Sequence, residues 1–118
     1  MKRITLQITR PPYSGTRVLE ALDAAMVAAV FDFQTSVLFR GEGVYCLLAD
    51  QNADNLPNKT LARVLSAMPA YDINQIYVCE HSLQQFGLEV DQLIDGVSLI
   101  STDAIGTLLN NQDAVLGV

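Results

Sequence analysis

The stretch Thr35-Ser36-Val37-Leu38-Phe39 is made of β-branched, apolar and aromatic residues at nearly every position and carries no charge. Such a run is typical of a strand that helices cover on both faces, because neither row of its side chains meets water. On either side of it, four more segments have the length and composition of strands. These predicted strands cover residues 4–8, 73–78, 97–100 and 114–118.

Helical patterns fill the intervals between the predicted strands. From Leu61 to Met68 the apolar residues follow the spacing i, i+3, i+4, i+7 of one helix face. Other helical segments are predicted from a cap at Ser14 or Thr16 to about Phe31, over residues 44–48 and 82–86, and from a cap at Thr102 onward. Strands that alternate with helices imply right-handed crossovers and a sheet covered on both faces. We therefore predict a single α/β domain over residues 1–118, with a five-stranded, mainly parallel sheet.

The composition is unusually apolar for a chain of this size. Half of the 118 residues are hydrophobic, and the mean hydropathy is +0.25. A lone domain of this length has difficulty hiding so much apolar surface, so we expect part of it to be buried against another subunit.

Charge is distributed unevenly along the chain. Residues 1–63 hold all seven Lys and Arg beside six acidic residues, whereas residues 64–118 hold seven acidic residues and no Lys or Arg. The formal net charge of −6 repels phosphate backbones, so we expect no direct nucleic-acid binding.

Several features predict a cytoplasmic protein with neither metal nor cofactor. No apolar run has the ~18–20 residues that span a bilayer, so we expect no membrane insertion. The first residues lead directly into a predicted strand without the apolar core of a signal peptide. Cys46 and Cys79 are too few for a disulfide scaffold, and the single His81 leaves too few ligands for a structural metal site. Glycine-rich phosphate loops and the GxSxG elbow are also missing from the sequence.

Cys79 is the candidate site residue, because it follows a buried strand where a helix begins. In parallel sheets, ligands and chemistry gather at the carboxyl ends of strands. A helix start favours a thiolate, and His81 stands two residues further on as a possible acid or base. Glu80 opposes a second negative charge. The alternative is that Cys79 is a small buried residue at a strand end, a common place for a free cysteine.

Two other groups of residues have weaker claims to a function. Cys46 lies in an apolar segment and is predicted to be a packing residue. Arg10, Tyr13 and Arg17 flank the first strand–helix loop, where they either meet a partner or an anion or are simply solvated.

Short motifs in a common order resemble the DsrE/DsrF-like family, in the branch that forms bacterial sulfur-relay complexes. The resemblance runs from Met1 to the last predicted strand. Its motifs are Met1-Lys2-Arg3-Ile4, Gly15-Thr16 with Leu22-Asp23-Ala24, Gly43-Val44 with Leu47-Leu48, Tyr71-Asp72-Ile73, and Val78-Cys79-x-x-Ser82-Leu83-x-x-x-Gly87-Leu88.

The resemblance implies a three-layer α/β/α fold and a place in a heterohexamer. The chain would assemble with TusB-like and TusD-like subunits, two such heterotrimers forming the complex, and would help to pass persulfide sulfur toward 2-thiouridine at the tRNA wobble position. Cys79 matches the sulfur-carrying cysteine of the TusD-like subunit. The subunit that this chain resembles is a structural partner, which implies a non-catalytic member of a sulfurtransferase complex.

Two alternatives stay open at the level of sequence. In the first, Cys79 itself accepts a persulfide and His81 assists. In the second, the chain is a homo-oligomeric module of the same fold that binds a small molecule.

Overall fold

A computed structural model describes residues 2–12, 17–49 and 56–117, with the side chains of residues 56–60 and 62 left aside. The strands are β1 (Arg3–Ile8), β2 (Gln34–Phe39), β3 (Gln75–Cys79), β4 (Val97–Ile100) and β5 (Ala114–Gly117). The α-helices are α1 (Arg17–Val30), α2 (Leu56–Ala67), α3 (Glu80–Gln85) and α4 (Thr102–Asn110). Short 3-10 helices are η1 (Gly41–Leu47), η2 (Met68–Tyr71) and η3 (Val90–Gln92).

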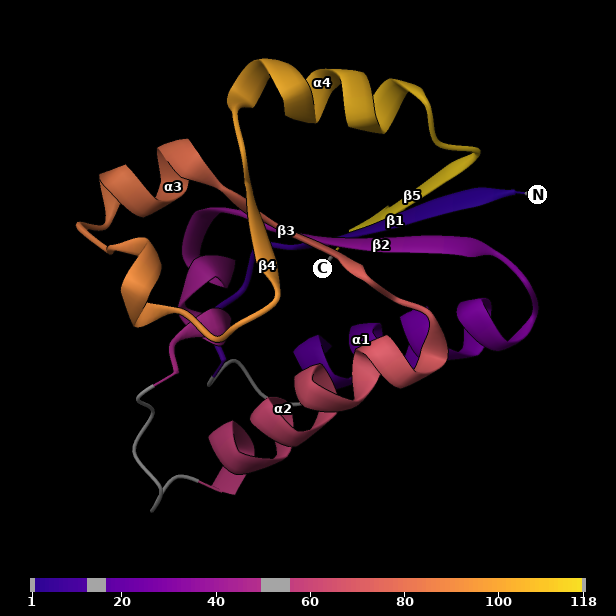
Figure 1. Cartoon of the computed structure of the whole chain (residues 1–118), viewed down its shortest axis with the longest axis horizontal. Helices are drawn as coiled ribbons and strands as arrows, with labels where there is room; N and C mark the ends of the chain where they lie inside the picture. The colour runs from indigo at the N-terminus through magenta and orange to yellow at the C-terminus, as the bar shows by residue number, and fades with distance from the viewer. Residues whose placement is uncertain (1, 13–16, 50–55, 118) are drawn as a thin grey trace.

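The strands form one five-stranded sheet in the order β4-β3-β2-β1-β5, and every pair in it is parallel. From β1 to β4 the chain advances in one direction, and the connection to β5 then returns across the sheet to the far side of β1. Because crossovers are right-handed, this reversal puts its helix on the opposite face. Figure 1 shows α4 on one side of the sheet and α1 and α2 on the other. The predicted three-layer α/β/α fold with a parallel sheet is confirmed.

The face of the sheet toward α1 and α2 carries the larger core. Alternate residues of the strands point to this face, and Ile8, Phe39 and Val78 are fully buried in it. Helix α1 contributes Val18, Ala21, Leu22 and Ala25 at the spacing of one helix face. Two of these four residues are alanines, whose small side chains let the helix lie close to the sheet.

The face toward α4 is partly polar. The hydroxyl groups of Thr5 and Ser36, on neighbouring strands, are hydrogen-bonded to each other at 2.7 Å and are buried. Beside them, Leu38, Cys79, Ile100 and Ile105 form a second, smaller apolar cluster. Residues 35–39 are all buried, as the sequence predicts for a strand covered on both faces.

Several predicted boundaries are displaced, each for a local reason. The third strand begins at Gln75 rather than at residue 73, because η2 ends at Asp72 in the left-handed conformation and the Ile73 N–H donates back to the Met68 carbonyl. It also extends through Cys79, and α3 starts at once at Glu80. The segment after β2 is helical from Gly41, as a 3-10 helix. The last strand is described to Gly117.

The cap of α4 is Ser101, and the prediction of Thr102 is wrong. Ser101 has extended backbone angles, and its Oγ accepts a hydrogen bond from the Ala104 N–H at 3.2 Å. Thr102 is already the first helical residue, so its side chain stands past the capping position. The caps predicted for the first helix, Ser14 and Thr16, lie outside the described residues.

Candidate functional site

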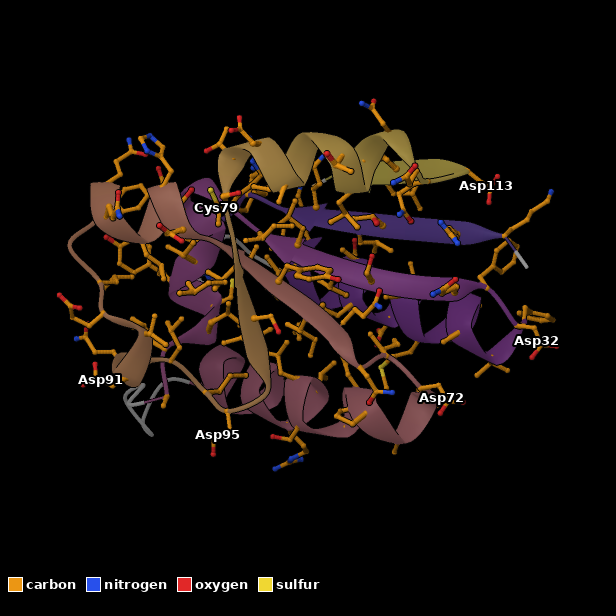
Figure 2. The ribbon with its side chains drawn as sticks, turned by 45° about the horizontal axis from the view of Figure 1, so that its top comes forward. Asp32, Asp72, Cys79, Asp91, Asp95 and Asp113 are labelled. Carbon is orange, nitrogen blue, oxygen red and sulfur yellow. The ribbon has the colours of Figure 1, made fainter. Side chains whose placement is uncertain are left out.

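Cys79 is the last residue of β3 and the N-cap of α3. It pairs in register with Ile100, the last residue of β4, so the candidate site lies at the carboxyl edge of the sheet. Figure 2 shows Cys79 where α3 leaves β3, near the start of α4. The predicted position at a strand–helix junction is therefore what the structure has.

The thiol of Cys79 is enclosed by apolar side chains. Cys79 is 3 % exposed, and it belongs to the cluster with Leu38 of β2, Ile100 of β4 and Ile105 of α4. Its side chain makes no capping hydrogen bond to α3. A sulfur atom in this position meets a reagent only after the cluster around it opens.

His81, the predicted assisting residue, is on the solvent side of α3. Both Glu80 and His81 are exposed, whereas Ser82 and Leu83 are buried. In the described part of the chain, no hydrogen bond joins His81 to Cys79. Ser82 is the inward polar residue, and its Oγ accepts a hydrogen bond from the Gly41 N–H at 2.9 Å. The structure therefore brings Ser82, rather than His81, to the junction between α3 and η1.

Arg40 is a basic residue at this edge that the sequence analysis did not assign. It follows β2 directly, and its N–H donates to the Ile8 carbonyl at 3.0 Å. Continuing the β2–β3 register by one residue from Phe39 and Val78 places the Arg40 backbone beside Cys79. The guanidinium turns toward β1, where Nη1 donates to Gln7 Oε1 at 3.1 Å. The sequence signal was a basic residue at the end of a buried strand, which places it at the same sheet edge as Cys79.

Cys46 lies in the larger core on the other face of the sheet. Its Sγ donates to the Arg10 carbonyl at 3.5 Å. Burial raises the pKa of the Cys46 thiol from 9.0 to about 12, against a smaller lowering by a backbone hydrogen bond. At neutral pH this thiol is protonated, which agrees with a packing residue.

Of the three candidate residues at the first strand–helix loop, the structure describes two. Arg10 and Arg17 are exposed and line a hollow of about 470 Å³ together with Glu20, Ala21 and Gly117. Glu20 places a carboxylate in the same hollow, so the lining has both signs of charge. Tyr13 lies outside the described residues.

The described residues offer neither a metal-binding group nor a membrane-spanning helix. None of their His, Cys, Asp and Glu side chains gather in a group of three or more that could hold a metal ion. No helix in this part of the chain is long and apolar enough to cross a membrane.

Comparison with known proteins identifies the family. The sequence profile of the DsrE/DsrF-like family matches residues 2–118. The chain belongs to the DsrE/DsrF-like family. The resemblance of its sequence motifs to this family is thereby confirmed.

Curated proteins are similar to this chain over almost its whole length. A protein named "Protein TusC homolog" from Vibrio vulnificus is 34% identical over 116 residues, which is 98% of both chains. Another protein of that name, from Pseudomonas aeruginosa, is 32% identical over 117 residues, again 98% of both chains. The length and the sequence of this chain therefore correspond to those of proteins named TusC homologues.

Solved structures agree in fold. The crystal structure of the ychN protein from E. coli superimposes with a TM-score of 0.80 at 16% identity, and all of both chains is covered. The MTH1491 protein from Methanobacterium thermoautotrophicum superimposes with a TM-score of 0.75 at 18% identity, also over all of both chains. At these identities the likeness concerns the fold alone.

Proposed function

We propose that this chain is a cytoplasmic, mainly structural subunit of a sulfur-relay complex that supports 2-thiolation of the tRNA wobble uridine. The observation that carries the proposal is the similarity to TusC homologues over 98% of the chain. The burial of Cys79 in an apolar cluster supports a holding role over a reacting one. The proposed partners are TusB-like and TusD-like subunits, in a heterohexamer built from two heterotrimers.

Deletion and rescue test this proposal. In a strain lacking the gene, we expect the 2-thiouridine content of tRNA, measured by mass spectrometry of nucleosides, to fall, and expression of the wild-type chain to restore it. The chain should also copurify in equal amounts with the TusB-like and TusD-like subunits of the same organism. Unchanged thiolation in the deletion strain, or a chain that remains a monomer beside both subunits, would overturn the proposal.

The structural role is separated from a chemical one by Cys79→Ala. In a subunit that only holds its partners, Cys79 serves to pack against Leu38 and Ile100. Alanine lacks only the sulfur atom of cysteine, so the cluster loses little packing. We therefore expect Cys79→Ala to restore thiolation as the wild type does. Failure of a folded Cys79→Ala chain that still binds its partners would favour the alternative below.

The alternative is that Cys79 carries the sulfur. Its position at the carboxyl end of a parallel strand favours this reading. In the transfer, the Cys79 thiolate attacks the outer sulfur of a donor persulfide. A new S–S bond forms at Cys79, and the S–S bond of the donor breaks. The donor leaves as a thiolate, which takes up the proton that the Cys79 thiol lost when it became a thiolate. No oxidant is needed, because one persulfide replaces another.

Mass spectrometry after incubation with a persulfide donor tests the carrier role. A carrier gains about 32 Da, one sulfur atom, and the gain disappears in Cys79→Ser but persists in Cys46→Ser. A native chain that takes up no sulfur, alone and within the complex, would exclude this alternative.

A further inference from the structure

Helix α1 carries a row of apolar residues beside the face that packs on the sheet. Along α1, Met26, Val27 and Val30 recur with Asp23 at i, i+3, i+4 and i+7. Met26 also packs against the larger core, whereas Val27 and Val30 are exposed. Together with Phe31 and Tyr71 they line a hollow of about 500 Å³. We call this feature the α1 hollow.

Most of the apolar side chains that line the α1 hollow are exposed to water. Val27, Val30 and Phe31 are 56, 62 and 71 % exposed, and Tyr71 of η2 is 42 % exposed. Large apolar residues gathered in this way mark interaction sites, whereas single exposed ones are ordinary. The α1 hollow therefore accounts for part of the apolar excess in the composition.

Acidic residues border the α1 hollow. Asp23 lines it, and Asp32 and Asp72, both exposed, directly follow Phe31 and Tyr71. Figure 2 shows Asp32 and Asp72 at the same end of the molecule, away from Asp91 and Asp95. Neither residues 18–39 nor residues 64–118 contain a Lys or Arg. The two segments that build the hollow thus carry negative charge only.

This charge decides what kind of partner fits. A second copy of the chain docked through the same face would bring carboxylates against carboxylates, and such like-charge contacts are unfavourable. A complementary partner has Lys or Arg around an apolar side chain. Aromatic and aliphatic anchors surrounded by polar residues are the usual composition of protein interfaces.

We propose that the α1 hollow docks an apolar anchor of a different protein chain, whose flanking Lys or Arg residues pair with Asp23, Asp32 and Asp72. This inference rests on the proposed function in one respect, because it takes that chain to be another subunit of the relay complex. Beyond that function, it names the α1 hollow as the contact surface of this chain. It also names an apolar anchor flanked by Lys or Arg as the matching surface of the partner.

Removal of the anchor pocket is the first arm of the test. The double variant Val30→Ser/Phe31→Ser changes two exposed side chains, and circular dichroism checks that it is folded. We expect its affinity for the purified TusB-like and TusD-like subunits, measured by calorimetry, to fall about 30-fold or more. The matched control, Val90→Ser, alters a valine of similar exposure, 49 %, in η3 and should bind like the wild type.

Removal of the acidic charges around the α1 hollow is the second arm of the test. Asp23→Asn/Asp32→Asn/Asp72→Asn removes three charges, and asparagine tolerates the left-handed backbone of residues 32 and 72, where φ is +67° and +64°. We expect association with the same subunits to slow about tenfold at low salt and to lose much of its salt dependence. The control Asp91→Asn/Asp95→Asn removes charge elsewhere and should leave both properties near the wild-type values.

The outcomes separate this inference from the proposed function. A wild-type chain that does not bind the two subunits overturns the proposed function. Wild-type binding that the hollow variants retain within twofold overturns the docking surface alone. A homodimer of the isolated chain that Val30→Ser/Phe31→Ser dissociates, seen by analytical ultracentrifugation, also overturns the choice of a different chain as the partner.

Discussion

At the scale of single residues, the two thiols are buried in different layers of the molecule. Cys46 lies in the core between the sheet and helices α1 and α2, and Cys79 lies in the small cluster beneath α4. Of the two, only Cys79 is at the end of a strand. The two thiols are chemically the same group and differ only in where the fold places them.

The raised pKa of Cys46 makes stability depend on alkaline pH. Its pKa is about 12 in the folded chain and 9.0 when unperturbed, so above pH 9 the unfolded chain loses a proton that the folded chain keeps. The free energy of unfolding is unaffected by this thiol below pH 9. It falls by about 1.4 kcal/mol per pH unit as the pH rises from 9 toward 12. Urea unfolding of the wild type and Cys46→Ala between pH 8 and 10.5 measures the difference. Parallel pH curves for the two proteins would contradict this prediction.

Gly43 is required by a close approach of two backbones. A Cβ at this position would lie 2.0 Å from the Ile8 carbonyl oxygen, and neither η1 nor the end of β1 can move without disturbing the core. We expect Gly43→Ala to lower the free energy of unfolding by about 2 kcal/mol. Gly106→Ala is the control, because a Cβ there meets nothing within 4 Å and alanine favours the interior of α4 by about 1 kcal/mol. A stable Gly43→Ala chain would show that η1 shifts freely.

At the scale of elements, α4 is the helix that packs over the cluster around Cys79. This helix has only Ile105 fully in the cluster, with Leu108 and Leu109 partly buried, so a small area holds it on the sheet. Local opening of such an element is easier than unfolding of the central strands. We therefore expect the cap at Ser101 and the packing of Ile105 to set how often the thiol is uncovered.

Loss of the α4 cap should expose Cys79. Ser101→Ala removes the acceptor of the Ala104 N–H, which costs about 1 kcal/mol. If that loss falls on the opening of α4, alkylation of Cys79 by iodoacetamide speeds up about fivefold. Thr102→Ala, one residue past the cap, is the matched control and should react at the wild-type rate. A Ser101→Ala chain that is less stable yet alkylated no faster would show that α4 is not the cover that opens.

At the scale of the whole molecule, charge and apolar surface favour protein partners. The formal net charge is −6, and no Lys or Arg follows Arg63. The exposed apolar residues of α1 and η2 lie among acidic residues, so the surface suits a basic protein partner better than a polyanion. A role near tRNA would then pass through other subunits.

Direct binding to tRNA should accordingly be absent from the isolated chain. Cations that neutralise phosphates supply nearly all non-specific nucleic-acid affinity, which is about 10⁻⁴–10⁻⁶ M for ordinary binders. We expect no shift of labelled tRNA by the chain at 100 μM protein (about 10⁻⁴ M, the weak end of that range) and physiological salt. A micromolar complex would contradict the proposed division of work between subunits.

Much of the fold was predictable because the residue types within a strand indicate whether one or both of its faces are buried. Residues 35–39 predicted a strand covered on both faces, and residues 97–100 predicted β4 with the bounds that the structure has. The cap of α4 was misplaced by one residue, because serine and threonine stand side by side and composition does not say which one begins the helix. The start of β3 was misplaced because η2 and the left-handed Asp72 depend on contacts with α1.

The candidate site was only half predictable. That Cys79 ends a strand and precedes a helix follows from the order of residues along the chain. That His81 faces solvent, Ser82 faces η1 and Arg40 stands at the neighbouring strand end depends on where α3 starts and which strands are adjacent. The alternation of strands and helices, the charge imbalance and the family all follow from the order of residues. The enclosure of Cys79 and the exposed apolar residues of α1 follow from the packing of the folded chain instead, because burial depends on which segments far apart in the chain come together.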